Sequence, residues 1–100
     1  MAKSKTRAQK ATVERVMHEF KEGELRTGSD GTKVKNPRQA IAIALSEAGA
    51  SNRETAKRNK AALARTKGKE KRGETAQAEK EGKKAQDRTL AKGARGGKKD

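Results

Sequence analysis

The chain has 100 residues and a formal net charge of +14, from 27 lysines and arginines against 13 aspartates and glutamates. Hydrophobic residues make up 29% of the sequence, and 17 of these 29 residues are alanines, which bury little area. Nine of the eleven large apolar residues after Met1 lie between Val13 and Leu45. Burial of nine such side chains contributes roughly 14–27 kcal/mol, which the ordering of about 35–40 residues would offset. We therefore expect one short folded segment and exclude a globule of 100 residues.

The same composition narrows the classes of protein and of partner. Low hydrophobicity with high net charge is typical of disordered chains, and a strong positive excess favours polyanionic partners. The absence of cysteine excludes disulfides and thiolate metal sites. No apolar run reaches the length of a membrane span, and the N-terminus has no apolar signal-peptide region. We expect a cytoplasmic protein without a membrane partner.

The first helix is predicted after a basic, flexible arm at residues 1–11, and extension of the helix into this arm is left open. Four apolar residues then follow the i, i+3, i+4, i+7 spacing of one helical face. Thr12 is the expected N-cap and Gly23 the expected stop, which gives a helix over residues 12–22. The residues of the apolar stripe are Val13, Val16, Met17 and Phe20.

The segment 24–35 contains a strong turn signal, GSDG at 28–31. A β-hairpin closed at this turn would pair Arg26 with Lys33, and its alternation would place Leu25 and Val34 on one apolar face. Because such a hairpin is too short to be stable alone, an ordered loop remains the alternative.

The second helix is predicted over residues 37–48. Asn36 is placed as its N-cap, Pro37 as its first residue, and Gln39 completes a capping-box pattern. Gly49 supplies the stop. Ile41, Ala44, Leu45 and Ala48 form one expected face, and Ile43 lies on the opposite side, so coverage of this helix on two sides is left open.

The remaining residues, 50–100, differ in composition from the rest. Residues 51–100 contain 17 basic and 7 acidic residues, and their only large apolar residues are Leu63 and Leu90. We expect a largely disordered or transiently helical tail. The predicted fold is thus mostly α: a helix–loop (or β-hairpin)–helix module at 12–49, between the basic arm and this tail.

No group of residues predicts catalysis or metal binding. His18 is the only histidine and is expected to lie on the surface without ligand partners. Arg15 and Glu19 are expected to form an i,i+4 surface ion pair. The acidic residues near the first helix are also expected to be solvated: Glu14, Glu19, Glu22 and Glu24. We therefore expect no enzyme activity, no cofactor, no metal and no small-molecule substrate.

The basic residues form the one group with a predicted function. Four of them converge near the N-terminus of the second helix, where free N–H groups and the helix dipole favour a phosphate, although solvated surface charge is an equal alternative. Phe20, the sole aromatic residue, belongs to the core, so base stacking is absent and contacts to the phosphate backbone are expected. The candidate nucleic-acid-binding residues are Arg26, Lys33, Lys35, Arg38, Lys57, Arg58, Lys60, Arg65, Lys67, Lys69, Lys71 and Arg72.

The runs VMHEFK at 16–21 and KVKNPRQAIAIALSEAG at 33–49 resemble a signature of small basic bacterial proteins that have no established function. Some members of that family are labelled plasmid-stabilisation proteins, a label without a mechanism. The resemblance covers about residues 13–50, implies a bacterial or phage origin and supports the two-helix module as a unit. The tail is similar in composition to those of linker histones and bacterial histone-like proteins.

The sequence thus predicts an accessory or compaction protein that binds nucleic acid without sequence specificity, DNA in preference to RNA, in the bacterial nucleoid. A homodimer formed through the helical module is a further hypothesis. Two alternatives stay open. Alternating charges in residues 70–87 favour a hydrophilic stress protectant without a specific ligand, and the same net charge would suit an RNA- or ribosome-associated factor.

Overall fold

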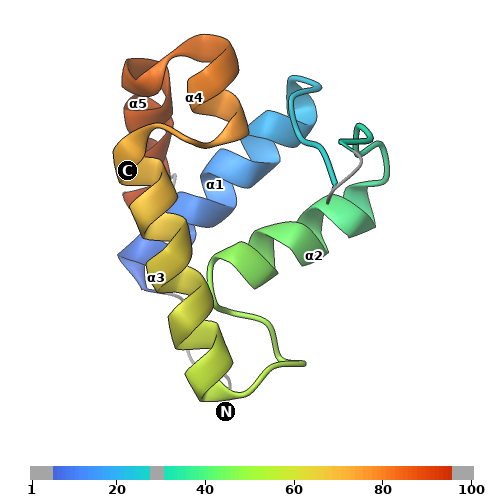
Figure 1. Cartoon of the computed structure of the whole chain (residues 1–100), viewed down its shortest axis with the longest axis vertical. Coiled ribbons are helices and arrows are strands. Elements are labelled where there is room, and N and C mark those ends of the chain that lie inside the picture. The colour runs from blue at the N-terminus through green and yellow to red at the C-terminus, as the bar shows by residue number, and fades with distance from the viewer. Residues whose placement is uncertain (1–5, 28–30, 96–100) are drawn as a thin grey trace.

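The computed structural model describes residues 6–27 and 31–95, and these residues form five helices. Helix α1 lies at the centre, packed against α2 on one side and against α5 and α4 on the other, while α3 contacts the end of α2 (Figure 1). None of these helices is long and apolar enough to cross a membrane. The helices are α1 (Arg7–Lys21), α2 (Pro37–Glu47), α3 (Ala56–Arg72), α4 (Ala76–Glu81) and α5 (Lys83–Ala94).

Helix α1 begins earlier than the sequence pattern predicted. Thr6, not Thr12, is its N-cap, and the Thr6 and Gln9 side chains form a reciprocal capping box. Residues 7–11 of the predicted arm are therefore helical. Thr12 is instead fully buried inside the protein. The predicted stop is confirmed, since Gly23 follows the last turn with a φ of +74°.

Between α1 and α2, residues 22–27 and 31–36 form a loop and contain no strand. A single antiparallel bridge joins Arg26 to Lys33, in the register predicted for a hairpin. The Val34 N–H donates to the Leu25 carbonyl at 2.9 Å, and both side chains are buried, as their common face predicted. Of the turn predicted at 28–31, residues 28–30 lie outside the described part of the chain.

Helix α2 has the predicted ends, and Ala44 and Ala48 of its predicted face are buried. The Asn36 side chain accepts the Arg38 N–H at 2.8 Å, and Gly49 ends the helix with a φ of +68°. Ile41, which was expected to be buried, is 48% exposed, whereas Ile43 packs against the core. The side chains turned fully inward are small, so α2 lies close to α1: Ala40, Ala44 and Ala48.

The apolar core joins α1, the loop and α2, as the concentration of apolar residues in this part of the sequence predicted. Its buried members are accompanied by partly buried side chains from α1 and α2. The buried members are Val16, Leu25, Val34, Ala40 and Ala44, and the partly buried ones are Val13, Met17, Phe20 and Ile43.

The prediction of a largely disordered tail differs most from the structure, because residues 56–94 form three packed helices. Helix α5 packs along α1 through Gly93, where only a hydrogen atom fits against the α1 backbone. The polar side chains Gln77 and Gln86 are fully buried, so hydroxyl and amide hydrogen bonds replace large apolar contacts. The estimate that excluded a larger globule counted only apolar burial. Residues 1–5 and 96–100 lie outside the described part of the chain.

Candidate nucleic-acid interface

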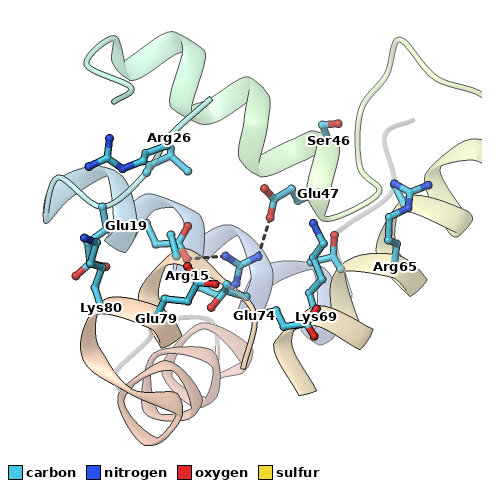
Figure 2. Close-up of a pocket in the computed structure, with 16 residues that line it drawn as sticks. Arg15, Glu19, Arg26, Ser46, Glu47, Arg65, Lys69, Glu74, Glu79 and Lys80 are labelled. Atoms are coloured by element: carbon cyan, nitrogen blue, oxygen red, sulfur yellow. Dashed lines mark hydrogen bonds and ion pairs between the residues drawn. The ribbon is translucent and has the colours of Figure 1, made fainter. Parts of the chain in front are cut away.

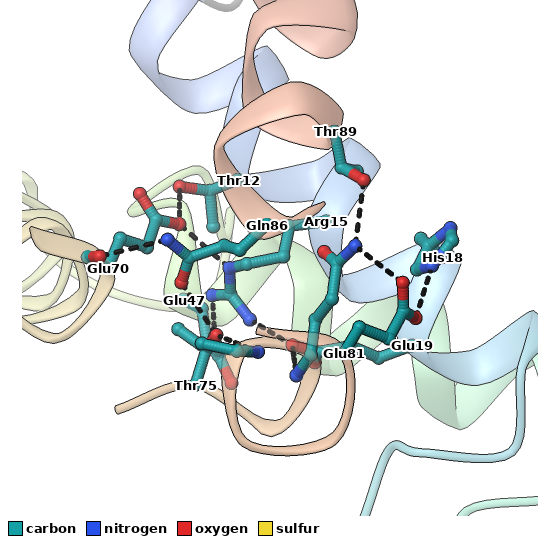
Figure 3. Close-up of polar contacts among 12 residues, drawn as sticks. Thr12, Arg15, His18, Glu19, Glu47, Glu70, Thr75, Glu81, Gln86 and Thr89 are labelled. Atoms are coloured by element: carbon teal, nitrogen blue, oxygen red, sulfur yellow. Dashed lines mark hydrogen bonds and ion pairs between the residues drawn. The ribbon is translucent and has the colours of Figure 1, made fainter. Parts of the chain in front are cut away.

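A buried guanidinium connects the helices beneath the candidate interface. Arg15 is 2% exposed and contacts three carboxylates from different parts of the chain (Figure 3). Its nitrogens lie 2.7 Å from Glu19, 2.7 Å from Glu47 and 2.9 Å from Glu70. Glu47 comes from α2 and Glu70 from α3. The predicted Arg15–Glu19 surface pair is therefore one part of a buried network.

The charges in this network stabilise one another. Burial disfavours a charged guanidinium, but the attraction of Glu19 and Glu47, with hydrogen bonds to Glu47 and Glu70, outweighs this effect and raises the pKa of Arg15. Burial raises the pKa of Glu19, although Arg15 and a 2.9 Å hydrogen bond from the Gln77 N–H partly offset the effect. The expectation of a solvated Glu19 is wrong, since this residue is 1% exposed.

The contacts of Glu70 determine which side of α3 faces the protein interior. One of its oxygens accepts hydrogen bonds from Thr12 at 2.8 Å and Arg15 at 2.9 Å, and the other contacts Lys67 at 2.8 Å. The Gln86 amide also donates to the Glu70 carbonyl at 2.9 Å. Glu70 is the only acidic residue of α3 and is 3% exposed. The helix therefore presents no carboxylate on its outer side.

Every exposed charged residue of α3 is basic. At about 100° per residue, its cations cover the arc opposite the buried Thr66 and Glu70. All are exposed except the half-buried Lys67. Among the described residues, ion pairs are formed by Lys67, by Arg58 with Glu54 and by Arg72 with Glu74. We call this set the α3 basic face: Lys57, Arg58, Lys60, Arg65, Lys67, Lys69, Lys71 and Arg72.

A cleft of about 490 Å³ borders the α3 basic face. Arg65 and Lys69 of α3 lie at one end of this cleft, and Arg26 and Lys80 lie at the other (Figure 2). The lining also contains five glutamates, one of which is Glu47, so cations and anions balance within the cleft. The cleft alone is therefore not a phosphate pocket, and the excess positive charge lies on the helix surface beside it.

The four basic residues predicted to gather near the α2 N-terminus remain a predicted site, and one of the four lines the cleft. Arg26 donates to the Gly31 carbonyl at 2.8 Å and lines the cleft. Lys33, Lys35 and Arg38 are exposed but are not part of the cleft lining. The eight predicted residues from the tail do share a surface, because they make up the α3 basic face.

His18 and Glu24 also differ from their expected surface positions. The His18 Nε2 atom lies 2.7 Å from a Glu81 oxygen, and Glu24 adjoins the same carboxylate. Burial, together with a hydrogen bond to Glu81, raises the pKa of Glu24 to about 7. The hydrogen bond from Glu24 lowers the pKa of Glu81. Sequence spacing could not show this cluster, because Glu81 is 63 positions from His18.

The fold and the basic helix define a small, basic, all-helical protein. The model of a family of unknown function, designated DUF6496, matches residues 3–58, and the chain belongs to this family. The match covers α1, the loop, α2 and the start of α3, and includes the segment that carries the resemblance noted above. No curated protein and no solved structure matches the chain.

Proposed function

We propose that the protein binds duplex nucleic acid without sequence specificity, and that the α3 basic face contacts the phosphate backbone. The observation that carries this proposal is the inward position of Glu70, which leaves eight cations and no anion on the outer side of α3. Each cation that neutralises a phosphate releases condensed counterions and so adds affinity at low salt. With one aromatic residue in the chain, base stacking contributes nothing.

The shape of the face favours DNA over RNA. The α3 helix has 17 residues and is about 25 Å long. Its cations lie on both edges of the exposed arc, for example Lys60 and Lys69, so a groove with phosphates on both walls suits them. The major groove of B-DNA admits an α-helix, whereas that of A-form RNA is too narrow. As part of the same proposal, we assign the protein an accessory or compaction role in a bacterial nucleoid.

The two alternative functions make different demands on the molecule. A stress protectant acts as a solvated chain, and the close packing of α5 on α1 argues against that mode for the described residues. An RNA-associated factor would use the same cations. Comparison of duplex DNA with duplex RNA therefore separates the two nucleic-acid functions.

The test is a salt series of binding to random-sequence duplex DNA and duplex RNA. One variant replaces four exposed cations of the α3 basic face that have no ion pair among the described residues: Lys57→Gln, Lys60→Gln, Arg65→Gln and Lys69→Gln. The matched control replaces three exposed cations of α5 and the exposed arginine that follows this helix: Lys84→Gln, Arg88→Gln, Lys92→Gln and Arg95→Gln. Each variant removes four positive charges, which lowers the formal net charge from +14 to +10.

If all four α3 side chains contact phosphates, the slope of log K against log salt becomes shallower by about 3.6. Affinity at 0.15 M salt then falls by about 10²–10³-fold, while the control variant loses much less. Circular dichroism of both variants checks that the helices are retained. Equal losses in the two variants would show that net charge alone drives binding. Absence of binding to either polymer at 50 mM salt would refute the proposal.

A further inference from the structure

Three side chains from three separate segments converge beside the C-terminal end of α1. His18 belongs to the last turn of α1, Glu24 to the loop that follows, and Glu81 to the end of α4. One nitrogen or oxygen atom of each lies within 4.8 Å of those of the other two. We propose that His18, Glu24 and Glu81 bind one divalent transition-metal ion, for which Zn²⁺ is the best match. This inference goes beyond nucleic-acid binding and does not depend on it.

The donor atoms suit such an ion. An imidazole nitrogen and two carboxylate oxygens are ordinary zinc ligands, at about 2.0–2.2 Å from the metal. A hard cation such as Mg²⁺ prefers oxygen ligands and an octahedral shell with several waters, so the imidazole disfavours it. Three protein ligands leave at least one coordination position for water. The absence of cysteine means that no thiolate competes for the metal.

The contacts at this site are incomplete without a cation or a bound proton. Two carboxyl groups adjoin one another, and like charges at this separation repel unless something positive lies between them. Among the described residues, only two buried side-chain oxygens have no hydrogen-bond partner: Glu24 Oε1 and Gln77 Oε1. Glu24 is a proposed ligand, and Gln77 is a direct neighbour of the proposed ligand Glu81. The unpartnered Glu24 oxygen therefore lies at the proposed site, and Gln77 borders the site through the contact of its Nε2 with Glu81.

Gln77 also supplies the supporting contact that metal ligands usually have. Its amide Nε2 lies 3.3 Å from Glu81 Oε1. The other Glu81 oxygen, Oε2, lies 2.7 Å from His18 Nε2 (Figure 3). The same amide nitrogen donates to Thr89 Oγ1 of α5 at 2.8 Å. Gln77 is 1% exposed, so its position is well determined by packing. Neighbours of this kind orient the side chains that bind the metal, and their mutation commonly weakens metal affinity by about 10–100-fold.

Metal binding at this site would join α4 to the first part of the chain. Helix α4 has only six residues, too few to be stable alone, and its packing on α1 is limited. An ion bound to Glu81 and to His18 would hold α4 against α1. Because the unfolded chain does not hold these three side chains together, binding would stabilise the folded state.

The experiment uses the untagged full-length chain, freed of metal with a chelator and then titrated calorimetrically with ZnCl2 or MgCl2. We expect one equivalent of Zn²⁺ to bind with a Kd in the micromolar range or tighter, and Mg²⁺ to bind far more weakly. Saturating Zn²⁺ should raise the Tm by several degrees.

Two substitutions separate this site from general surface binding. Glu24→Gln removes one of the three proposed ligands. The new amide can still donate a hydrogen bond to Glu81, as a protonated Glu24 does, so the metal-free variant should be folded. Its Zn²⁺ affinity should fall at least tenfold. Glu22→Gln is the control, because Glu22 is exposed, lies two residues away and has no ion pair among the described residues. Absence of Zn²⁺ binding by the wild-type chain, or equal Zn²⁺ affinities of the two variants, would overturn the proposal.

Discussion

Replacement of Gly93 by alanine tests whether α5 is docked on α1. A Cβ atom at this position would lie 2.5 Å from Glu14 Cβ and 2.8 Å from Ala11 Cα. It would also lie 2.9 Å from the Lys10 carbonyl oxygen. Two of these three atoms belong to the α1 backbone and cannot rotate away. Since carbon atoms pack at about 3.5–4.0 Å, α5 would have to move outward by about 1 Å.

The magnitude follows from two opposing effects. Alanine in place of glycine stabilises a helix interior by about 1 kcal/mol, whereas overpacking of a close contact costs about 1–3 kcal/mol. Gly68 is a matched control in α3, because an added Cβ there would meet chiefly the flexible end of Arg72, at 3.1 Å. We expect Gly68→Ala to stabilise the protein by about 0.5–1 kcal/mol. The free energy of unfolding of Gly93→Ala should be about 2 kcal/mol lower than that of Gly68→Ala.

Urea unfolding followed by circular dichroism measures both free energies, and hydrogen exchange reports on the α5 amides directly. The Gly93→Ala variant should lose exchange protection in α5, while Gly68→Ala should not. If Gly93→Ala stabilised the protein as much as Gly68→Ala, the docking of α5 on α1 would be refuted. Residues 83–94 would then behave as the transient helix that composition alone predicts.

Two further predictions concern the charged groups of α1 and its neighbours. Arg15→Met should lower the free energy of unfolding by about 3–5 kcal/mol, because it leaves buried carboxylates without their cation. Arg7→Met, at an exposed position of the same helix, is the control and should have little effect in the same urea assay. The second prediction concerns Glu24 in the metal-free protein, where folding raises the pKa of this residue to about 7. Glu24 should therefore stabilise the folded state at pH values below the ordinary pKa of a glutamate, and this contribution should be lost as the pH rises through about 7. Glu24→Gln should therefore reduce the decline in stability between pH 5 and pH 8, and an unchanged decline would contradict this assignment.

The elements that could be predicted from the sequence are those specified by local chemistry. Asn36, Pro37 and Gly49 mark the ends of α2 through capping and backbone geometry, and both ends were placed correctly within a residue. The alternation that paired Leu25 with Val34 also held, since both face the core. These signals act over a few residues, so tertiary contacts did not override them.

The parts that could not be predicted depend on contacts between distant residues. Arg15 and Glu19 have the spacing of an ordinary surface pair, and they are buried because Glu47 and Glu70 arrive from 32 and 55 positions away. The tail was judged by its lack of large apolar side chains. That criterion misses helices that meet backbone to backbone, as α5 meets α1 at Gly93.

The largest fully buried side chains among residues 6–27 and 31–95 have a thermodynamic consequence. They are led by Gln77, Gln86 and Glu19, which are polar or charged, and only then by Val16. Exposure of apolar surface raises the heat capacity on unfolding, whereas exposure of polar surface lowers it. The helices held by these residues should therefore add little to the heat-capacity change. A protein with such an interior has a flatter stability curve, so it loses less of its stability on cooling than an apolar core of equal size would.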